Sequence, residues 1–158
     1  MAFTGGAVGS PLGTNYSILT GTITATNNEI STPDNNYSVY TTDIVASENG
    51  SGVLINMDGE LVGVVMQSYS AASANTLTAV EISELMPVID LLFAYKEVPY
   101  FGVHISTVTQ HIAQKYDIPK GVYIKKVEMD SPAMDAGLQS GDVIRSVAGQ
   151  EGASAEQF

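Results

Sequence analysis

Ser51 and the two histidines, His104 and His111, are the side chains that could support nucleophilic catalysis. A serine hydrolase needs a His base to take the hydroxyl proton, a carboxylate to orient that His, and backbone N–H groups to stabilise the oxyanion. Ser51 stands in a short turn rich in Gly and polar residues. His104 is interpreted as a strand residue and His111 as a solvated helix residue. The sequence therefore offers a candidate nucleophile without a candidate base.

The chain has no Cys and only two His. These counts exclude disulfides, Cys nucleophiles and thiolate metal sites, and they argue against a zinc centre built from the protein alone. We therefore expect no bound metal and no cofactor.

The formal net charge is −11, and it is distributed unevenly along the 158 residues. Residues 1–95 hold nine carboxylates and no Lys or Arg, whereas residues 96–158 hold all six cations and eight carboxylates. An anionic surface repels phosphate groups, so nucleic acid and anionic membrane surfaces are not expected partners. The change at Lys96 predicts a domain boundary.

The composition, with 44% hydrophobic and 15% charged residues, is typical of a globular chain. No apolar stretch approaches the roughly 20 residues that span a bilayer. The first residues have neither the positive region nor the apolar core of a secretory signal. We expect no membrane segment and no targeting signal in this chain.

Residues 1–80 are predicted to be mainly β, because β-branched and aromatic runs alternate with Gly, Asn, Pro and Ser clusters. Asp58-Gly59 predicts a tight hairpin, since Gly supplies a positive φ. A helix with an apolar stripe is predicted at 83–95, with Ser83 as its N-cap. The predicted strands are 17–25, 37–42, 53–56, 61–67 and 76–80.

Residues 96–158 follow a different pattern, which predicts a small α+β domain. Gly137 is expected to end a helical turn. The predicted elements are strands at 101–105, 121–127 and 143–147, a helix at 107–116 and a helical turn at 132–136.

A series of short motifs runs through the first part of the chain in a fixed order. They are Gly9-Ser10-Pro11-Leu12-Gly13, Thr20-Gly21-Thr22-Ile23-Thr24, Thr42-Asp43, Asn49-Gly50-Ser51-Gly52, Asn56 with Gly59-Glu60 and Gly63, and Ala79-Val80-Glu81-Ile82. Their order and spacing resemble the HtrA/DegP-type proteases, in which a trypsin-like serine protease domain is followed by a PDZ domain. By this resemblance the polar loop 68–73 would border the pocket for the substrate side chain, although a solvated loop is the alternative.

The second part resembles the PDZ domain of the same family. Its most specific string is Ser131-Pro132-Ala133, with Ala136-Gly137-Leu138 and Gly141-Asp142-Val143-Ile144. The segment Tyr100, Phe101, Gly102 and Val103 resembles the PDZ carboxylate-binding loop. Such a loop can aim successive backbone N–H groups at a terminal carboxylate, while the adjoining strand edge accepts the peptide as an added strand. The alternative is an ordinary start of a strand.

The resemblance implies a mainly β fold with some α structure. Residues 1–95 would be the C-terminal half of a trypsin-like serine protease domain, a second β-barrel ending in a helix. Residues 96–158 would be a truncated PDZ domain, because the helix expected at 154–158 meets the end of the sequence. The implied partners are polypeptide substrates or protein C-termini, a first protease barrel missing from this chain, and further copies in a homo-oligomer, since an incomplete domain exposes apolar surface.

The nucleophile of the family falls on two different positions in this sequence. Counting forward from Thr42-Asp43 places it on Ser51, with the N–H groups of Asn49 and Ser51 as oxyanion donors. Counting back from Val53 places it on Gly50, because the turn is one residue shorter than the Gly-Asn-Ser-Gly-Gly-Pro of the family. A turn that has lost its catalytic role is the alternative.

Two functions remain open at this stage. The first is a fragment of an HtrA/DegP-like serine endopeptidase of the cell envelope, inactive as this chain because the triad His and Asp are absent. The second is a non-catalytic, protease-like protein that binds peptides and has a degenerate nucleophile loop.

Overall fold

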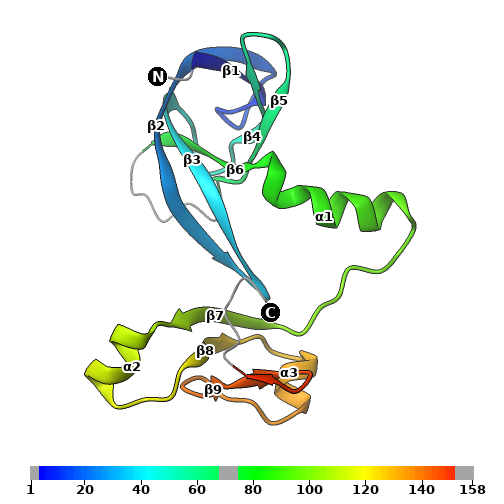
Figure 1. Ribbon diagram of the computed structural model, residues 1–158. Coiled ribbons are helices and arrows are strands. Elements are labelled where there is room, and N and C mark those ends of the chain that lie inside the picture. The colour runs from blue at the N-terminus through cyan, green and yellow to red at the C-terminus, as the bar shows by residue number, and fades with distance from the viewer. Residues whose placement is uncertain (1–3, 68–74, 152–158) are drawn as a thin grey trace. The chain divides into compact units, whose positions relative to one another are not determined.

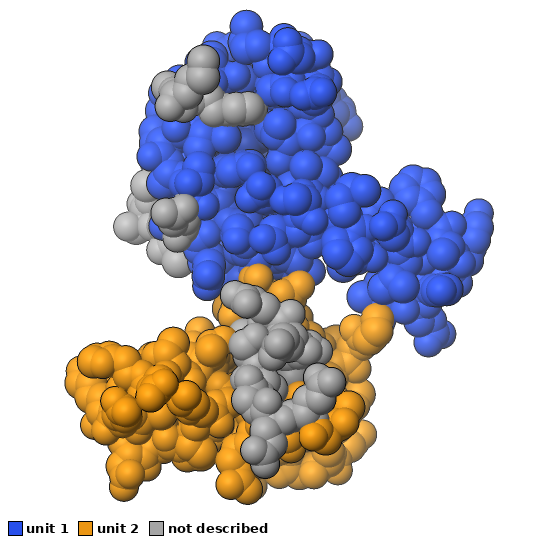
Figure 2. Space-filling view, in the orientation of Figure 1, with its two compact units in different colours: residues 1–30, 37–98 blue, residues 31–36, 99–158 orange. Residues whose placement is uncertain are grey.

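A computed structural model describes residues 4–67 and 75–151, which form two compact units (Figure 1). Unit 1 comprises residues 1–30 and 37–98, and unit 2 comprises residues 31–36 and 99–158 (Figure 2). Unit 2 therefore contains a short segment that lies early in the sequence. The expected helix at 154–158 and the polar loop 68–73 lie outside the described residues.

Unit 1 is a closed antiparallel barrel with the strand order β1-β2-β3-β6-β5-β4. Pairing of β1 with both β2 and β4 closes it. The mainly β fold expected for this part is confirmed. The strands are β1 (Thr4–Ser10), β2 (Ser17–Thr32), β3 (Asn35–Val45), β4 (Ser51–Asn56), β5 (Leu61–Val65) and β6 (Thr76–Glu81).

Strand β1 was not among the predicted strands, because its run of Gly and small residues lacks the usual β signature. Its glycines allow close packing instead. A Cβ on Gly9 would lie 2.6 Å from the Cα of Gly52, its partner on β4. Small residues therefore form a strand here because two backbones approach each other closely.

The predicted hairpin at Asp58-Gly59 is confirmed as the turn between β4 and β5. Gly59 has φ of 82°. The side-chain oxygen of Asn56 accepts hydrogen bonds from the backbone N–H groups of Asp58 and Glu60, at 3.0 and 2.8 Å. An Asx turn and a positive-φ Gly thus fix the register of these two strands.

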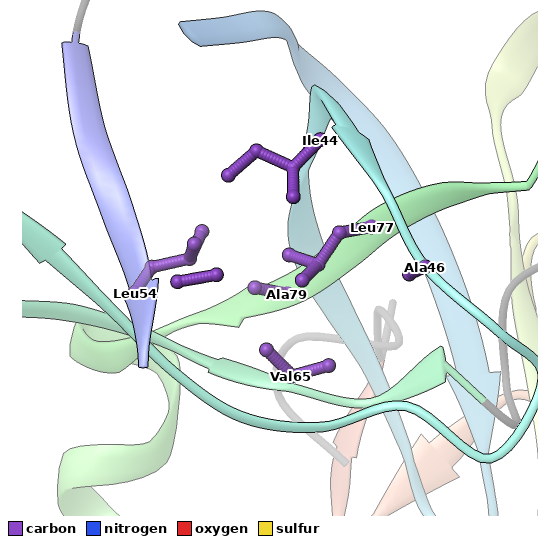
Figure 3. Packing of buried hydrophobic residues seen from close by; sticks show 7 residues of the cluster. Ile44, Ala46, Leu54, Val65, Leu77 and Ala79 are labelled. Atoms are coloured by element: carbon purple, nitrogen blue, oxygen red, sulfur yellow. The ribbon is translucent and has the colours of Figure 1, made fainter. Parts of the chain in front are cut away.

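The barrel interior is filled by apolar side chains from five strands (Figure 3). Leu77 and Ala79 on β6 have no exposed surface. They pack with Ala46, which follows β3, and with side chains from other strands of the barrel, which are Ala7, Ile44, Leu54 and Val65. This cluster is the main source of burial in unit 1.

Helix α1 (Ile82–Phe93) follows β6 directly. The prediction of Ser83 as its N-cap was wrong, because the helix begins at Ile82 and the N-cap is Glu81, which makes no side-chain capping hydrogen bond. No residue of α1 is fully buried, but Leu85 packs against the buried cluster of Ile30, Val39 and Val80. Near the end of the helix, Leu92 and Phe93 are 60% and 81% exposed.

Unit 2 has a three-stranded sheet of order β7-β8-β9 and a small β10-β11 hairpin. Its core consists of Val103, Ile105, Val122, Ile124 and Ala133. The elements are β7 (Val103–Val108), α2 (Gln110–Tyr116), β8 (Gly121–Val127), α3 (Pro132–Asp135), β9 (Val143–Ile144), β10 (Ser146–Val147) and β11 (Gln150–Glu151).

Several predicted boundaries in unit 2 shift in the structure. The strand predicted from 101 begins at Val103, because residues 100–102 form a loop, and the predicted helix 107–116 begins at Gln110 with Thr109 as its N-cap. The strand predicted at 143–147 is divided at Arg145. In the described ranges, the helices are too short or too polar to cross a bilayer.

Candidate functional site: a loop that binds a carboxylate

Three successive backbone N–H groups, two in the loop before β7 and one on the first residue of β7, converge on one carboxylate, that of Asp34. Phe101 N–H donates to Oδ2 at 2.7 Å, and Val103 N–H donates to Oδ1 at 2.9 Å. Gly102 N–H lies 2.8 and 2.9 Å from the two oxygens. These short distances are typical of charge-assisted hydrogen bonds. The loop is therefore a backbone nest for an anion.

Helix α3 and the segment before it hold this loop in place. The carbonyl of Phe101 accepts from Ala133 N–H at 2.9 Å, and the carbonyl of Gly102 accepts from Glu128 N–H at 2.8 Å. Ser131 is buried, caps α3 through Met134 N–H, and donates to the Glu128 carbonyl at 2.8 Å. Because the loop carbonyls are bonded inward, its N–H groups are directed to the carboxylate. The specific Ser-Pro-Ala string thus supports the site.

Gly102 has φ of 91°, a conformation that favours glycine. A Cβ at this position would collide with the Ser131 side chain. The loop thus needs glycine both for its backbone angle and for its packing.

Tyr100, the fourth residue of the predicted site, precedes these donors. Its side chain is 53% exposed. Its hydroxyl would lie 3.0 Å from a Cβ at Gly102, so the Tyr100 side chain folds back over the loop. The four predicted residues are thus the loop residues 100–102 and Val103, the first residue of β7, and together they are named the loop 100–103.

The two histidines of the chain lie in unit 2. On β7, His104 Nε2 lies 2.7 Å from Glu128 Oε1, and Nδ1 lies 3.5 Å from Ser31 Oγ. Two hydrogen bonds hold the pKa of Glu128 below its usual value. The one from Lys126 has the larger effect, and the one from His104 has the next largest. Glu128 thus has two partners, His104 and Lys126, whereas the contact of His104 with Ser31 is at the limit of hydrogen bonding. The arrangement fixes the side chain of His104 on β7.

Ser51, the candidate nucleophile, is exposed at the first position of β4 and pairs with Ser10 on β1. The turn before it is closed by Gly50 N–H, which donates to the Ser47 carbonyl at 2.8 Å. A Cβ on Gly50 would lie 2.5 Å from the Pro11 carbonyl oxygen, so no side chain fits at that position. Of the two positions proposed for the nucleophile, only 51 presents a hydroxyl, and residues 1–98 contain no His.

Asp43, from the Thr42-Asp43 motif, is bound by a single residue of β2. Thr22 N–H donates to Oδ1 at 2.7 Å, and its hydroxyl donates to Oδ2 at 2.8 Å. These two hydrogen bonds hold the pKa of Asp43 below its usual value of 3.8, and the one from the backbone N–H has the larger effect. Asp43 therefore has a structural role on the barrel.

We expect substitution of Thr22 by Val to raise the pKa of Asp43 part of the way to its usual value, because only the hydroxyl hydrogen bond is lost. The lowered pKa stabilises the fold at neutral pH, and this contribution is lost as the pH falls through the folded-state pKa. NMR titration of the Asp43 carboxyl measures the change. Thr24→Val is the control, since the Thr24 hydroxyl donates to the Thr41 carbonyl. Equal titration curves of the Asp43 carboxyl in Thr22→Val and Thr24→Val would show that the Thr22 hydroxyl does not lower this pKa.

Among the described residues, no group of three or more His, Cys, Asp or Glu is placed to hold a metal ion.

Asp34 was missed by sequence reasoning, where it counted only as one of nine acidic residues. It lies in the two-residue turn between β2 and β3 and has φ of 65°. Pro33-Asp34 between two β-branched runs is a local signal for a turn. The contact with a loop some 70 residues later is a tertiary feature that no local pattern predicts.

Comparisons with known proteins find relatives for nearly the whole chain. A PDZ domain family matches residues 123–157. A DegP-like periplasmic serine endoprotease of Marinomonas sp. (strain MWYL1) is 35% identical over 91% of this chain and 32% of its own length. A second DegP-like endoprotease, of Hahella chejuensis, is 34% identical over 92% of this chain and 32% of its own length.

Solved structures agree in fold. The HtrA-type protease AlgW with a decapeptide has a TM-score of 0.56 and 24% identity, and the match covers 95% of this chain and 48% of AlgW. The chain thus spans about a third of the length of the curated relatives and about half of this solved one.

Proposed function

We propose, on the premise that this chain is HtrA/DegP-like and carries a PDZ domain, that its C-terminal part binds the carboxylates of polypeptides. One observation carries the proposal. The N–H groups of Phe101, Gly102 and Val103 converge on a single carboxylate. We assign residues 96–158 to a PDZ domain and residues 1–95 to the second barrel of a trypsin-like protease domain.

For the whole protein we propose peptide-bond hydrolysis outside the cytoplasm. The support is the description of its relatives as periplasmic serine endoproteases. In this proposal Ser51 descends from the nucleophile, and the N–H groups of Asn49 and Ser51 descend from the oxyanion donors. Polypeptide substrates, a first protease barrel and other copies of this chain would be its partners. Exposed Leu92 and Phe93 on α1 are compatible with such association.

The 158-residue chain by itself should not hydrolyse peptides, because a Ser hydroxyl without a base is a weak nucleophile. Incubation with casein should give no cleavage above background, and a fluorophosphonate probe should leave Ser51 unlabelled. Turnover of casein by the purified chain, or labelling that Ser51→Ala abolishes, would contradict this proposal.

A non-catalytic, protease-like binding protein is the second candidate. The turn, which is one residue shorter than in the family, favours it, since counting back from Val53 places the nucleophile on Gly50, where no side chain fits. The coding sequence upstream discriminates the two candidates. A first barrel with His and Asp at triad spacing favours the enzyme, and a first barrel lacking either favours the binding protein.

Peptide binding is tested with decapeptides randomised in their last residues, as one pool with free C-termini and one pool with amidated C-termini. The Asp34→Asn chain is used beside the natural chain, because Asp34 occupies the loop. We expect the Asp34→Asn chain to bind peptides with free C-termini and not to bind amidated ones, since an amide has no negative charge for the N–H groups. Equal binding of both pools would refute carboxylate recognition.

A further inference from the structure

Asp34 presents the same chemical groups to unit 2 as the last residue of a bound peptide. Its carboxylate accepts from the three loop N–H groups, and its own backbone N–H donates to the Val103 carbonyl at 2.7 Å. A chain terminus offers a carboxylate and a backbone N–H on one residue. Aspartate offers both as well, with the carboxylate on its side chain.

The segment around Asp34 continues along the β7 edge of the sheet. Strand β7 is an outer strand of the β7-β8-β9 sheet. Asn36 Nδ2 donates to the Ile105 carbonyl at 3.3 Å, and Ser31 Oγ lies 3.5 Å from His104 Nδ1. Residues 31–36 therefore contact the strand edge that an added peptide strand would use.

The turn has the backbone that this contact needs. Asp34 has φ of 65°, an angle that is uncommon for residues other than Gly, Asn and Asp. Thr32, which is buried, closes the turn by donating from its hydroxyl to the Asn35 carbonyl at 3.1 Å. Asparagine tolerates the same angle as aspartate, so the backbone alone does not require a carboxylate at this position.

We propose that the loop 100–103 binds the turn 31–36 of its own chain as an internal ligand, with Asp34 in place of a terminal carboxylate. This inference rests on the proposed function of the same loop. A tethered ligand acts at a high effective concentration, so even a weak contact keeps the loop occupied. An external peptide binds only the fraction of molecules with an open loop, and its apparent affinity falls by that fraction.

The test compares the natural chain with Asp34→Asn and with Asp58→Asn. The first variant keeps the turn but replaces one oxygen by an NH2 group that cannot accept from the loop. Asp58→Asn removes the same charge from an exposed turn of unit 1. For the tightest peptide from the free-terminus pool, we expect Asp34→Asn to bind about tenfold more tightly or better. Asp58→Asn should bind like the natural chain.

A second readout does not depend on external peptide. In ¹⁵N NMR spectra without peptide, Asp34→Asn should shift the amide signals of Phe101, Gly102 and Val103 and speed their hydrogen exchange, whereas Asp58→Asn should not. Unchanged loop amides in Asp34→Asn would overturn the internal ligand. Loop signals that change on dilution of the natural chain would also overturn it, since they would assign Asp34 to a second copy.

The two proposals fail in different ways. Equal peptide affinity in all three chains overturns the internal ligand and leaves carboxylate binding intact. Absence of peptide binding in all three chains, together with shifted loop amides in Asp34→Asn, overturns external peptide binding and supports the internal ligand.

Discussion

Replacement of Gly102 by Ala should weaken peptide binding by unit 2 at least about tenfold. The added Cβ collides with Ser131, and φ of 91° disfavours any side chain, so the loop must move. The movement misaligns N–H groups that converge on one carboxylate. A hydrogen bond to a charged group is worth about 1.5–3 kcal/mol, so loss of one such bond accounts for the effect. Titration of the Asp34→Asn chain, with and without Gly102→Ala, with the selected peptide measures this loss of affinity.

Gly141→Ala is the matched control for this substitution. Gly141 lies in unit 2 and has φ of 102°, but a Cβ there meets no atom within 4 Å. Both variants pay the backbone cost of a side chain at positive φ, and only Gly102→Ala adds the collision. Equal peptide affinity for the two variants would show that the loop geometry does not determine binding.

Replacement of Leu77 by Ala should destabilise unit 1 by about 2–5 kcal/mol, the range for a fully buried Leu. Leu77 has no exposed surface and packs at the centre of the barrel cluster (Figure 3). Its removal leaves a cavity, because five strands of a closed barrel cannot collapse freely onto the space. Hydrogen exchange of unit 1 amides measures the loss without assuming that the two units unfold together.

Leu92→Ala provides the comparison, since Leu92 is 60% exposed on α1. Ala is also the better helix former, so this variant should lose less than about 1 kcal/mol. If Leu77→Ala were no less stable than Leu92→Ala, the barrel core described for unit 1 would be wrong.

The sequence predicted those elements whose signals are local. Asp58-Gly59 specified its hairpin because the positive φ and the Asn56 side chain act within the turn. The motif in residues 100–103 likewise located the loop. The Ser131 cap was not predicted, although Ser-Pro-Ala is a typical helix start.

What the sequence did not predict depends on contacts between distant segments. Strand β1 exists because Gly9 and Gly52 pack closely across two strands, and glycine carries no β signal of its own. The start of α1 at Ile82 follows from the end of β6 and not from the capping preference of Ser83. The contact of Asp34 with the loop joins segments whose proximity only the folded chain reveals.

The measurement that tests the central claim most directly is the titration of the ¹⁵N-labelled Asp34→Asn chain with the selected peptide in free and amidated forms. Carboxylate recognition by the loop predicts saturable shifts of the Phe101, Gly102 and Val103 amide signals with the free form, and much smaller shifts with the amidated form. Equal shifts with both forms, or saturable binding that leaves these three amides unchanged, would contradict it.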